Sequence, residues 1–357
     1  MKKSLPDILI IFLLTAATII FEISLSRLFS YLLSFHFVLI IIAFSILGLG
    51  IGQISYAKFY NRMDKALGFW AALPAIAMFL GFSLLLALSK ISGSSFNDLG
   101  LLAFIVFSIV PFIAIGIVYA FIFEKNKRHA STFYAIDLIG AAGGALVSVF
   151  LLNTFSLVYV VAIVIGLLLL VWAINALANT NRYSRALALL SVAIIILMGL
   201  GKDALDIDIP VSKDPSKDMY RLMNNPALQS EKLESRWSAF GKTDLVQFTY
   251  PDSTVSKTMF IDGAAGTEVV NIDELAKDNI KIRKALSGFP AVFAMNFVNE
   301  NDKDSVLIIG PGGGIDIAAA YFSGYSYIDA VEVNPSFVQL MEKYNPATFL
   351  EKENIKV

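Results

Sequence analysis

Hydrophobic and polar positions divide this chain into two parts that meet at about Gly201. Before that residue, long apolar runs alternate with short polar segments, and six runs are long enough to cross a hydrocarbon core of about 30 Å as helices. These predicted spans lie close to residues 8–23, 37–52, 67–88, 99–123, 133–152 and 155–174. A further run, 186–200, is shorter than the roughly 17 to 25 residues that a span needs, so six or seven spans are predicted.

The distribution of charge supports the same division. Hydrophobic residues make up 57% of the chain and charged residues only 16%, a balance far from that of an ordinary soluble domain. Of the 29 acidic residues, those that precede Lys202 are only Asp7, Glu22, Asp64, Asp98, Glu124 and Asp137. We therefore predict a multispanning membrane domain over 1–202, with the lipid bilayer as its partner, and a soluble part after it.

Lysine and arginine in the short loops predict the orientation of the membrane domain. The opposite loops carry little beyond Arg27 and Lys90, whereas one set of loops carries Lys2, Lys3, Lys58, Arg62, Lys65, Lys125, Lys127, Arg128, Arg182 and Arg185. The positive-inside rule then places the N-terminus in the cytoplasm, which we expect to be bounded by a bacterial-type inner membrane. Six spans would leave the soluble part in the cytoplasm, and seven would place it outside.

Three ionisable residues in or beside the spans, Glu22, Arg27 and Asp137, form a candidate membrane site. Such groups are costly to bury in lipid unless they are paired or face a polar cavity. They indicate either a transport pathway, or a structural ion pair or interfacial snorkelling. The second interpretation is favoured because Glu22 and Arg27 lie near a predicted span end, and Asp137 is the better functional candidate.

Two pairs of glycines form small-xxx-small ridges, Gly48 with Gly52 and Gly140 with Gly144. Small residues at this spacing allow another helix to approach closely. A bundle with several spans needs such contacts of its own, so we expect both ridges to be packing seams inside the chain rather than dimerisation sites.

The soluble part begins with a polar stretch over 203–235 that contains several prolines and predicts a linker. Alternating residues over 244–250 and 258–261, with a turn between them, predict a β-hairpin. This small β module and its connecting helices occupy 236–300, and a further domain begins at about residue 301.

A glycine-rich loop in this last domain carries the strongest chemical signal. Residues 305–309 form a buried type of strand, and Gly310, Gly312 and Gly314 follow it at once. Glycines at these positions allow a tight turn and let the backbone approach a ligand closely. The pattern therefore predicts a ligand-binding turn after the first strand.

A helix and a second strand complete the predicted unit. Asp316 can begin the helix and Gly324 can end it. The strand over 327–333 then carries Glu332 about 20 residues after the first glycine, where a carboxylate can accept hydrogen bonds from both ribose hydroxyls. The order and spacing predict a nucleoside-binding site, whereas a glycine loop alone could simply let a helix pack on a sheet.

Several classes of ligand are disfavoured. Ile315 stands where a nicotinamide-binding loop has its third glycine, and the Gly-Lys-Ser/Thr of a P-loop is absent, so an adenosylmethionine-type ligand fits better. The chain has no cysteine and only two distant histidines, so we expect no metal. A net charge of -1 without a basic run gives no reason to expect a nucleic-acid partner.

Segments from both parts of the chain carry a resemblance to a known family. They are Phe21-Glu22 with Arg27, 47–52, 134–141, Trp237–Gly241, 261–263, Gly310–Gly314 with Asp316, and 331–335. Together they resemble the spermidine synthase-like proteins with an N-terminal multispanning membrane domain, which are related to aminopropyltransferases and to the adenosylmethionine-dependent methyltransferase fold. The resemblance covers most of the chain.

The resemblance implies the fold class and the binding residues. The fold would be a polytopic α-helical membrane domain, a small β module, and the start of a Rossmann-like α/β domain over 301–357. S-adenosylmethionine or its decarboxylated form would serve as co-substrate, with Glu332 at its ribose and Asp316 either in contact with the ligand or capping its helix. The methionine or aminopropyl portion would be wrapped by Gly310, Gly312, Gly313 and Gly314.

Departures from the family pattern limit what can be carried over. In spermidine synthases a glutamine and then a Tyr-His-Glu segment follow the Asp-Gly pair, whereas Ala264, Ala265 and Gly266 follow Asp262-Gly263 here. The family's catalytic acid and its adenine-binding acidic residue would lie beyond Val357. The catalytic residues are therefore unidentified, and we expect either a fragment of a longer protein or a chain without catalysis.

These observations predict a membrane-bound transferase that moves an aminopropyl group, as in polyamine biosynthesis, or a methyl group. The acceptor would be a small-molecule amine or another small nucleophile. The alternative is a membrane transporter or sensor with a degenerate nucleoside-binding domain, which Asp137, Glu22 and Arg27 motivate. The sequence leaves the acceptor and the oligomeric state open.

Overall fold

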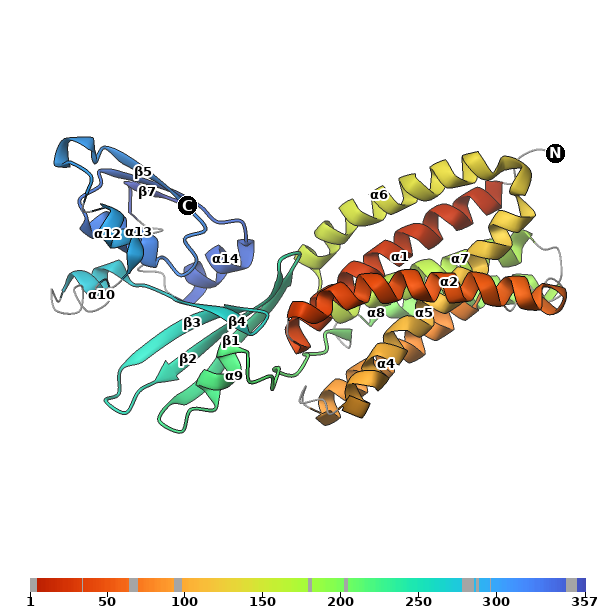
Figure 1. Cartoon of the computed structure of the whole chain (residues 1–357), viewed down its shortest axis with the longest axis horizontal. Coiled ribbons are helices and arrows are strands. Elements are labelled where there is room, and N and C mark those ends of the chain that lie inside the picture. The colour runs from red at the N-terminus through yellow and green to blue at the C-terminus, as the bar shows by residue number, and fades with distance from the viewer. Residues whose placement is uncertain are drawn as a thin grey trace. The chain divides into compact units, whose positions relative to one another are not determined.

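A computed structural model describes residues 5–33, 35–63, 70–92, 98–178, 182–201, 205–277, 286, 289–295, 297–344 and 352–357. The chain divides into two compact units, Met1–Asp214 and Pro215–Val357 (Figure 1).

The first unit consists of helices. They are α1 (Leu5–Leu32), α2 (Val38–Met63), α4 (Leu73–Ser92), α5 (Asp98–Lys125), α6 (Ala130–Thr154), α7 (Leu157–Ala178) and α8 (Arg182–Leu200), with 3₁₀ turns η1 (Phe35–Phe37) and η3 (Lys127–His129). Within the described residues, α1, α2, α4, α5, α6 and α7 are long and apolar enough to cross a membrane, which agrees with the six predicted spans. The apolar part of α8, Ala188–Leu200, is shorter.

Helix α1 lies in the interior of this bundle and is longer than its predicted span. Leu14, Phe21 and Leu28 recur every seven residues and are fully buried. The helix packs mainly against α6 and α7, and α6 runs beside it in Figure 1. Because apolar residues continue after Glu22, the helix does not end near residue 23 but extends to Leu32. Glu22 therefore lies inside the helix and not at the end of a span.

Both glycine ridges are confirmed as seams inside the chain. A Cβ atom at Gly52 of α2 would lie 2.2 Å from the Ile113 carbonyl oxygen of α5. A Cβ atom at Gly144 of α6 would lie 2.8 Å from the Ala16 backbone of α1. Real Cβ atoms do not approach backbone this closely, so these helix crossings depend on the glycines.

An ion pair joins two helix ends of the first unit. The Asp7 carboxylate, whose side chain is only 4% exposed, accepts hydrogen bonds from Lys125 Nζ at 2.9 Å and from Asn126 Nδ2 at 3.1 Å. The beginning of α1 and the end of α5 therefore lie at the same end of the bundle, where the loop charges predict a common side.

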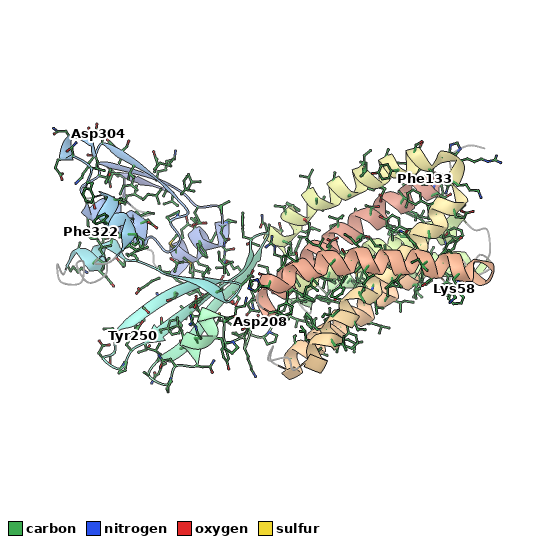
Figure 2. All side chains as sticks on the ribbon, in the orientation of Figure 1. Lys58, Phe133, Asp208, Tyr250, Asp304 and Phe322 are labelled. Carbon is green, nitrogen blue, oxygen red and sulfur yellow. The ribbon has the colours of Figure 1, made fainter. Side chains whose placement is uncertain are left out.

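The second unit contains an antiparallel sheet of β1 (Gln229–Ser238), β2 (Gly241–Thr249), β3 (Val255–Ile261) and β4 (Ala264–Glu268), in that order. The predicted hairpin corresponds to β2 and β3, and Figure 2 shows Tyr250 at the turn between them. Helix α9 (Asp218–Met223) and the start of β1 lie inside the stretch that the sequence predicts as a linker. Strand β1 is polar and half-exposed, so it lacks the apolar alternation that would reveal it.

A three-stranded parallel sheet follows, with β5 (Ser305–Ile309), β6 (Tyr327–Val331) and β7 (Ile355–Lys356) in that order. Helix α13 (Ile315–Phe322) connects the first two strands, and α14 (Pro335–Tyr344) follows the second. One face of the sheet, with Ile308, Ile328 and Ala330, is buried in a core shared with both helices. The short elements α10 (Ile272–Ala276), α12 (Pro290–Met295) and η5 (Glu300–Asp302) precede β5.

Candidate functional site

The glycine loop of the second unit directly follows β5. Gly310, Gly312 and Gly314 have φ angles of 71°, 55° and 98°, in the left-handed region where most side chains are strained. Gly314 is the N-cap residue of α13, which begins at Ile315. The chain therefore leaves the carboxyl end of β5 through a tight turn that leads into a helix N-terminus. The N–H groups of the four loop glycines all donate hydrogen bonds within the unit.

Glu332 is the first residue after β6 and lies beside this loop. Strands β5 and β6 are parallel neighbours, and the Gly310 N–H extends their pairing by donating to the Val331 carbonyl at 2.9 Å. The Glu332 carboxylate accepts hydrogen bonds from the N–H of Gly312 at 3.1 Å and from the N–H of Asn334 at 2.8 Å. The structure thus brings together the loop and the carboxylate, which are about 20 residues apart in the sequence.

The bonding of Glu332 leaves acceptor capacity for a ligand. Its Oε2 accepts from Gly312 and its Oε1 from Asn334, and each carboxylate oxygen has about two acceptor positions. The side chain is half-buried. One further hydrogen bond at each oxygen suits two neighbouring hydroxyl groups, while the two backbone bonds hold the carboxylate in place.

The glycines of the loop have different structural roles. A Cβ atom at Gly313 would lie 1.9 Å from the Glu268 carbonyl oxygen. The Gly313 N–H donates to Thr267 Oγ1 at 2.9 Å, and its carbonyl accepts from the Val270 N–H at 2.9 Å. Gly313 is therefore needed for packing against the end of β4, whereas no atom lies within 4 Å of a Cβ built at Gly310. The open side of the loop is at Gly310.

Asp316 lies in the first turn of α13 but does not cap the helix. Gly314 takes the N-cap position and the helix begins at Ile315, so the prediction that Asp316 begins the helix is off by one residue. The physical reason is the left-handed conformation of Gly314, which starts the helix earlier. Partial burial raises the pKa of the Asp316 carboxyl.

A cavity of about 480 Å³ lies beside β4 in the same unit. Lys257, Glu268, Glu274 and Ile315 are among its lining residues, whereas Glu332 is not among those that the structure describes there. Burial raises the pKa of the Glu268 carboxyl, whose backbone carbonyl faces Gly313.

Comparisons with known proteins give one informative match. No protein-family model matches the chain, and no solved structure matches it. Polyamine aminopropyltransferase 1 of Streptomyces coelicolor (strain ATCC BAA-471 / A3(2) / M145) is 25% identical over 98% of this chain. The chain is similar to a polyamine aminopropyltransferase. It spans 63% of the length of that relative, and the similarity extends over both units.

The segments that resemble the aminopropyltransferase-related family in the β module build a turn. Asp262 and Gly263, with φ angles of 51° and 70°, connect β3 to β4, as an Asp-Gly pair does in tight hairpins. Asp262 Oδ1 accepts from the Lys242 N–H at 2.9 Å, and its approach to Gly241 leaves no room for a Cβ there. These residues thus shape the turns of the sheet.

Sequence analysis missed a buried polar link between this β module and the candidate site. Asn334, two residues after Glu332, donates from Nδ2 to Thr243 Oγ1 at 3.0 Å, and both residues are buried. Next to Thr243, the fully buried Lys242 and Asp244 form an ion pair with an Nζ to Oδ1 distance of 3.7 Å. The available signal was a charged residue, Asp244, at the start of the predicted strand 244–250, directly after the polar residues Lys242 and Thr243.

The structure brings two of the three predicted membrane residues to one cavity. Glu22 of α1 and Asp137 of α6 both line a cavity of about 630 Å³ in the first unit. Asp137 Oδ1 accepts hydrogen bonds from Thr15 Oγ1 at 2.6 Å and from the Tyr119 hydroxyl at 2.9 Å. Arg27 is not among the described residues that line this cavity. Thr15 and Tyr119 were not singled out in the sequence.

Proposed function

We propose that residues 301–357 of the second unit are the start of a Rossmann-like domain that binds S-adenosylmethionine or its decarboxylated form. The observation that carries the proposal is the hydrogen bond between the glycine loop and Glu332, at the carboxyl ends of neighbouring parallel strands. Open α/β sheets bind ligands at this edge. The similarity to a polyamine aminopropyltransferase supports the decarboxylated form, which carries an aminopropyl group.

The proposed reaction transfers that aminopropyl group to a small amine, with methyl transfer to a small nucleophile as the variant for S-adenosylmethionine. The nitrogen attacks the carbon bonded to the sulfonium sulfur, the carbon–sulfur bond breaks with its electrons on sulfur, and a thioether leaves. The attacking nitrogen loses its proton to a general base. Orientation of the sulfonium and this proton transfer would supply much of the rate.

The described residues account for the binding part of this reaction. Glu332 would accept both ribose hydroxyls, and the open backbone at Gly310 would face the sulfonium side chain. The half-buried Asp316 lies at the start of α13, close enough in sequence to the loop to contact the same ligand. The six apolar helices would hold this enzyme in a bacterial inner membrane, with the N-terminus on the cytoplasmic side.

Isothermal titration of the purified full-length protein with decarboxylated S-adenosylmethionine tests the proposal. Glu332→Gln replaces one acceptor oxygen by an NH₂ group that cannot accept a ribose hydroxyl. Loss of a charge-assisted hydrogen bond costs about 1.5 to 3 kcal/mol, so we expect the affinity to fall by about tenfold or more.

Asp329→Asn is the matched control, because Asp329 lies on the same strand and is exposed. Its affinity should equal that of the wild type. Unchanged affinity in Glu332→Gln, or an equal loss in both variants, would show that the ribose is not held at Glu332.

The alternative function, a membrane transporter or sensor with a degenerate nucleoside-binding domain, is supported by the cavity that Asp137 and Glu22 line in the first unit. This alternative would be favoured over the transferase if the wild type took up amines into proteoliposomes but showed no group transfer, and if Asp137→Asn lost the uptake.

A further inference from the structure

The cavity of about 630 Å³ in the first unit is lined by a polar stripe from four helices. Its volume lies within the roughly 300 to 1,000 Å³ that is typical of small-molecule sites. The polar residues that line it are Thr15, Thr18 and Glu22 of α1, Ser45 and Gln53 of α2, Tyr119 of α5 and Asp137 of α6. Of these residues, the two ionisable ones, Glu22 and Asp137, are costly between membrane helices and by default mark a functional site.

The charge of this cavity is uncompensated by the side chains that line it. Glu22 and Asp137 are acidic, and no lysine, arginine or histidine is among the described lining residues. Thr15 and Tyr119 both donate to Asp137 Oδ1, whereas no described side chain donates to Oδ2. Carboxylates within a membrane are costly without a cation or a proton, so the cavity favours a positively charged occupant.

The spacing of the two carboxylates favours an occupant with two charges. Thr15, which holds Asp137, and Glu22 are seven residues apart on α1, which corresponds to about 10 Å along the helix axis. If one ammonium nitrogen lies about 2.9 Å from each carboxylate at the two ends of this interval, about 5 Å remains between the two nitrogen atoms. A short aliphatic diamine has its ammonium groups at a separation of this order and would neutralise both carboxylates.

Apolar residues in the same lining suit the hydrocarbon part of such a molecule. Ile19, Ile46, Leu49 and Phe123 line the same cavity. A bare metal ion would leave most of this volume empty, and the described residues contain no group of three metal-ligating side chains. The lining therefore matches an alkyl chain with an ammonium group at each end.

A second cavity of about 550 Å³ provides a route to the loop between α5 and α6. It shares Gln53, Ala120 and Phe123 with the first cavity and extends to Glu124 and Lys127. By the loop charges this end of the bundle is cytoplasmic, so a soluble cation would enter from that side.

We propose that these residues form an intramembrane binding site for a short aliphatic diamine, with one ammonium group at Asp137 and the other at Glu22. The site uses no residue of the second unit, so this proposal stands or falls independently of the transferase proposal.

The test uses the full-length protein in nanodiscs of phosphatidylcholine and phosphatidylglycerol, which offer no primary amine, and measures binding of radiolabelled 1,4-diaminobutane. We expect saturable binding that Asp137→Asn and Glu22→Gln each weaken by about tenfold or more, because each variant removes a charge-assisted contact. Unlabelled 1-aminobutane, with a single ammonium group, should compete much less well than the unlabelled diamine.

Three further variants protect the test against misfolding and against binding elsewhere. Ala141→Leu fills the cavity without a change of charge and should also abolish binding, whereas Glu300→Gln, at an exposed carboxylate, should bind like the wild type. Glu332→Gln should lose nucleoside affinity and keep diamine binding. The proposal would be overturned if the wild type did not bind the diamine, or if Asp137→Asn and Glu22→Gln still bound it. Competition by 1-aminobutane equal to that by the diamine would also overturn it.

Discussion

Gly313 and Gly310 are neighbours in one loop, yet a single methyl group should affect them differently. In Gly313→Ala the new Cβ would lie 1.9 Å from the backbone oxygen of Glu268, so β4 or the loop must move. We expect this variant to lose about 1 to 3 kcal/mol of stability, as overpacked sites do. Thermal unfolding of the full-length protein measures the loss.

Gly310→Ala is the matched comparison. Its Cβ would meet no atom within 4 Å, so only the left-handed φ of 71° opposes it, at about 1 to 2 kcal/mol. We expect this variant to weaken nucleoside binding more than its small loss of folding stability would explain, because the methyl group would occupy the open side of the loop. Equal effects of the two substitutions on affinity would contradict the division of roles between these glycines.

At the residue scale, the sequence predicts contacts within one strand–helix–strand unit and misses contacts between residues far apart in the chain. The spacing of Gly312 and Glu332 follows from a strand, a helix and a second strand, and the structure joins the two by a hydrogen bond. The contact of Gly313 with Glu268 and the bond of Thr15 to Asp137 unite residues far apart in the chain. No period or motif signals such contacts.

Among elements, Glu234 of β1 joins the antiparallel sheet to α14. Its carboxylate accepts hydrogen bonds from Lys343 at 2.5 Å, from Arg236 at 2.7 Å and from Tyr344 at 2.9 Å. Partial burial alone would raise its pKa, but these hydrogen bonds outweigh burial and lower the pKa of Glu234 from 4.5 to about 2. The ionised form therefore stabilises the contact between β1 and α14.

A lowered pKa makes this stabilisation depend on pH. The folded protein binds the proton less tightly than the unfolded chain, so the contribution is fully present above about pH 4.5 and is lost as the pH falls towards 2. We expect Glu234→Gln to lower the unfolding temperature of the second unit at pH 6, by an amount that shrinks between pH 4.5 and 2.

The control for this experiment is Glu231→Gln, at an exposed position of the same strand. It should leave the unfolding temperature unchanged over the same pH range. A destabilisation by Glu234→Gln that does not vary with pH would assign the effect to packing and not to the charge of the carboxylate.

Elements with a buried face were predictable, and those without one were not. Strand β5 has the predicted bounds, since an apolar run marks it. Strand β1 is polar and half-exposed, and β7 has two residues, so neither produces a pattern. The glycine seams of α2 and α6 were predictable because small residues at this spacing have one common use in a membrane bundle.

For the whole molecule, composition alone predicts an apolar part and a polar part that meet near Gly201. The structure has the six long apolar helices in the first unit and divides the chain a little later, between Asp214 and Pro215. Composition does not predict the polar cavity within the bundle, which needs residues from α1, α2, α5 and α6 to converge. Nor does it determine on which side of the bilayer the second unit lies, because that depends on α8.

We expect that helix α8 does not span the membrane. Its apolar part, Ala188–Leu200, covers about 20 Å at 1.5 Å per residue, less than the roughly 30 Å of a hydrocarbon core. The chain has no cysteine, so single cysteines can report the side of each segment to a membrane-impermeant thiol reagent. We expect Ala276→Cys in α10 to react from the same side as Lys127→Cys, and Thr154→Cys at the end of α6 to react from the opposite side. If Ala276→Cys reacts instead from the side of Thr154→Cys, α8 crosses the membrane, and an intracellular adenosyl ligand could not reach Glu332.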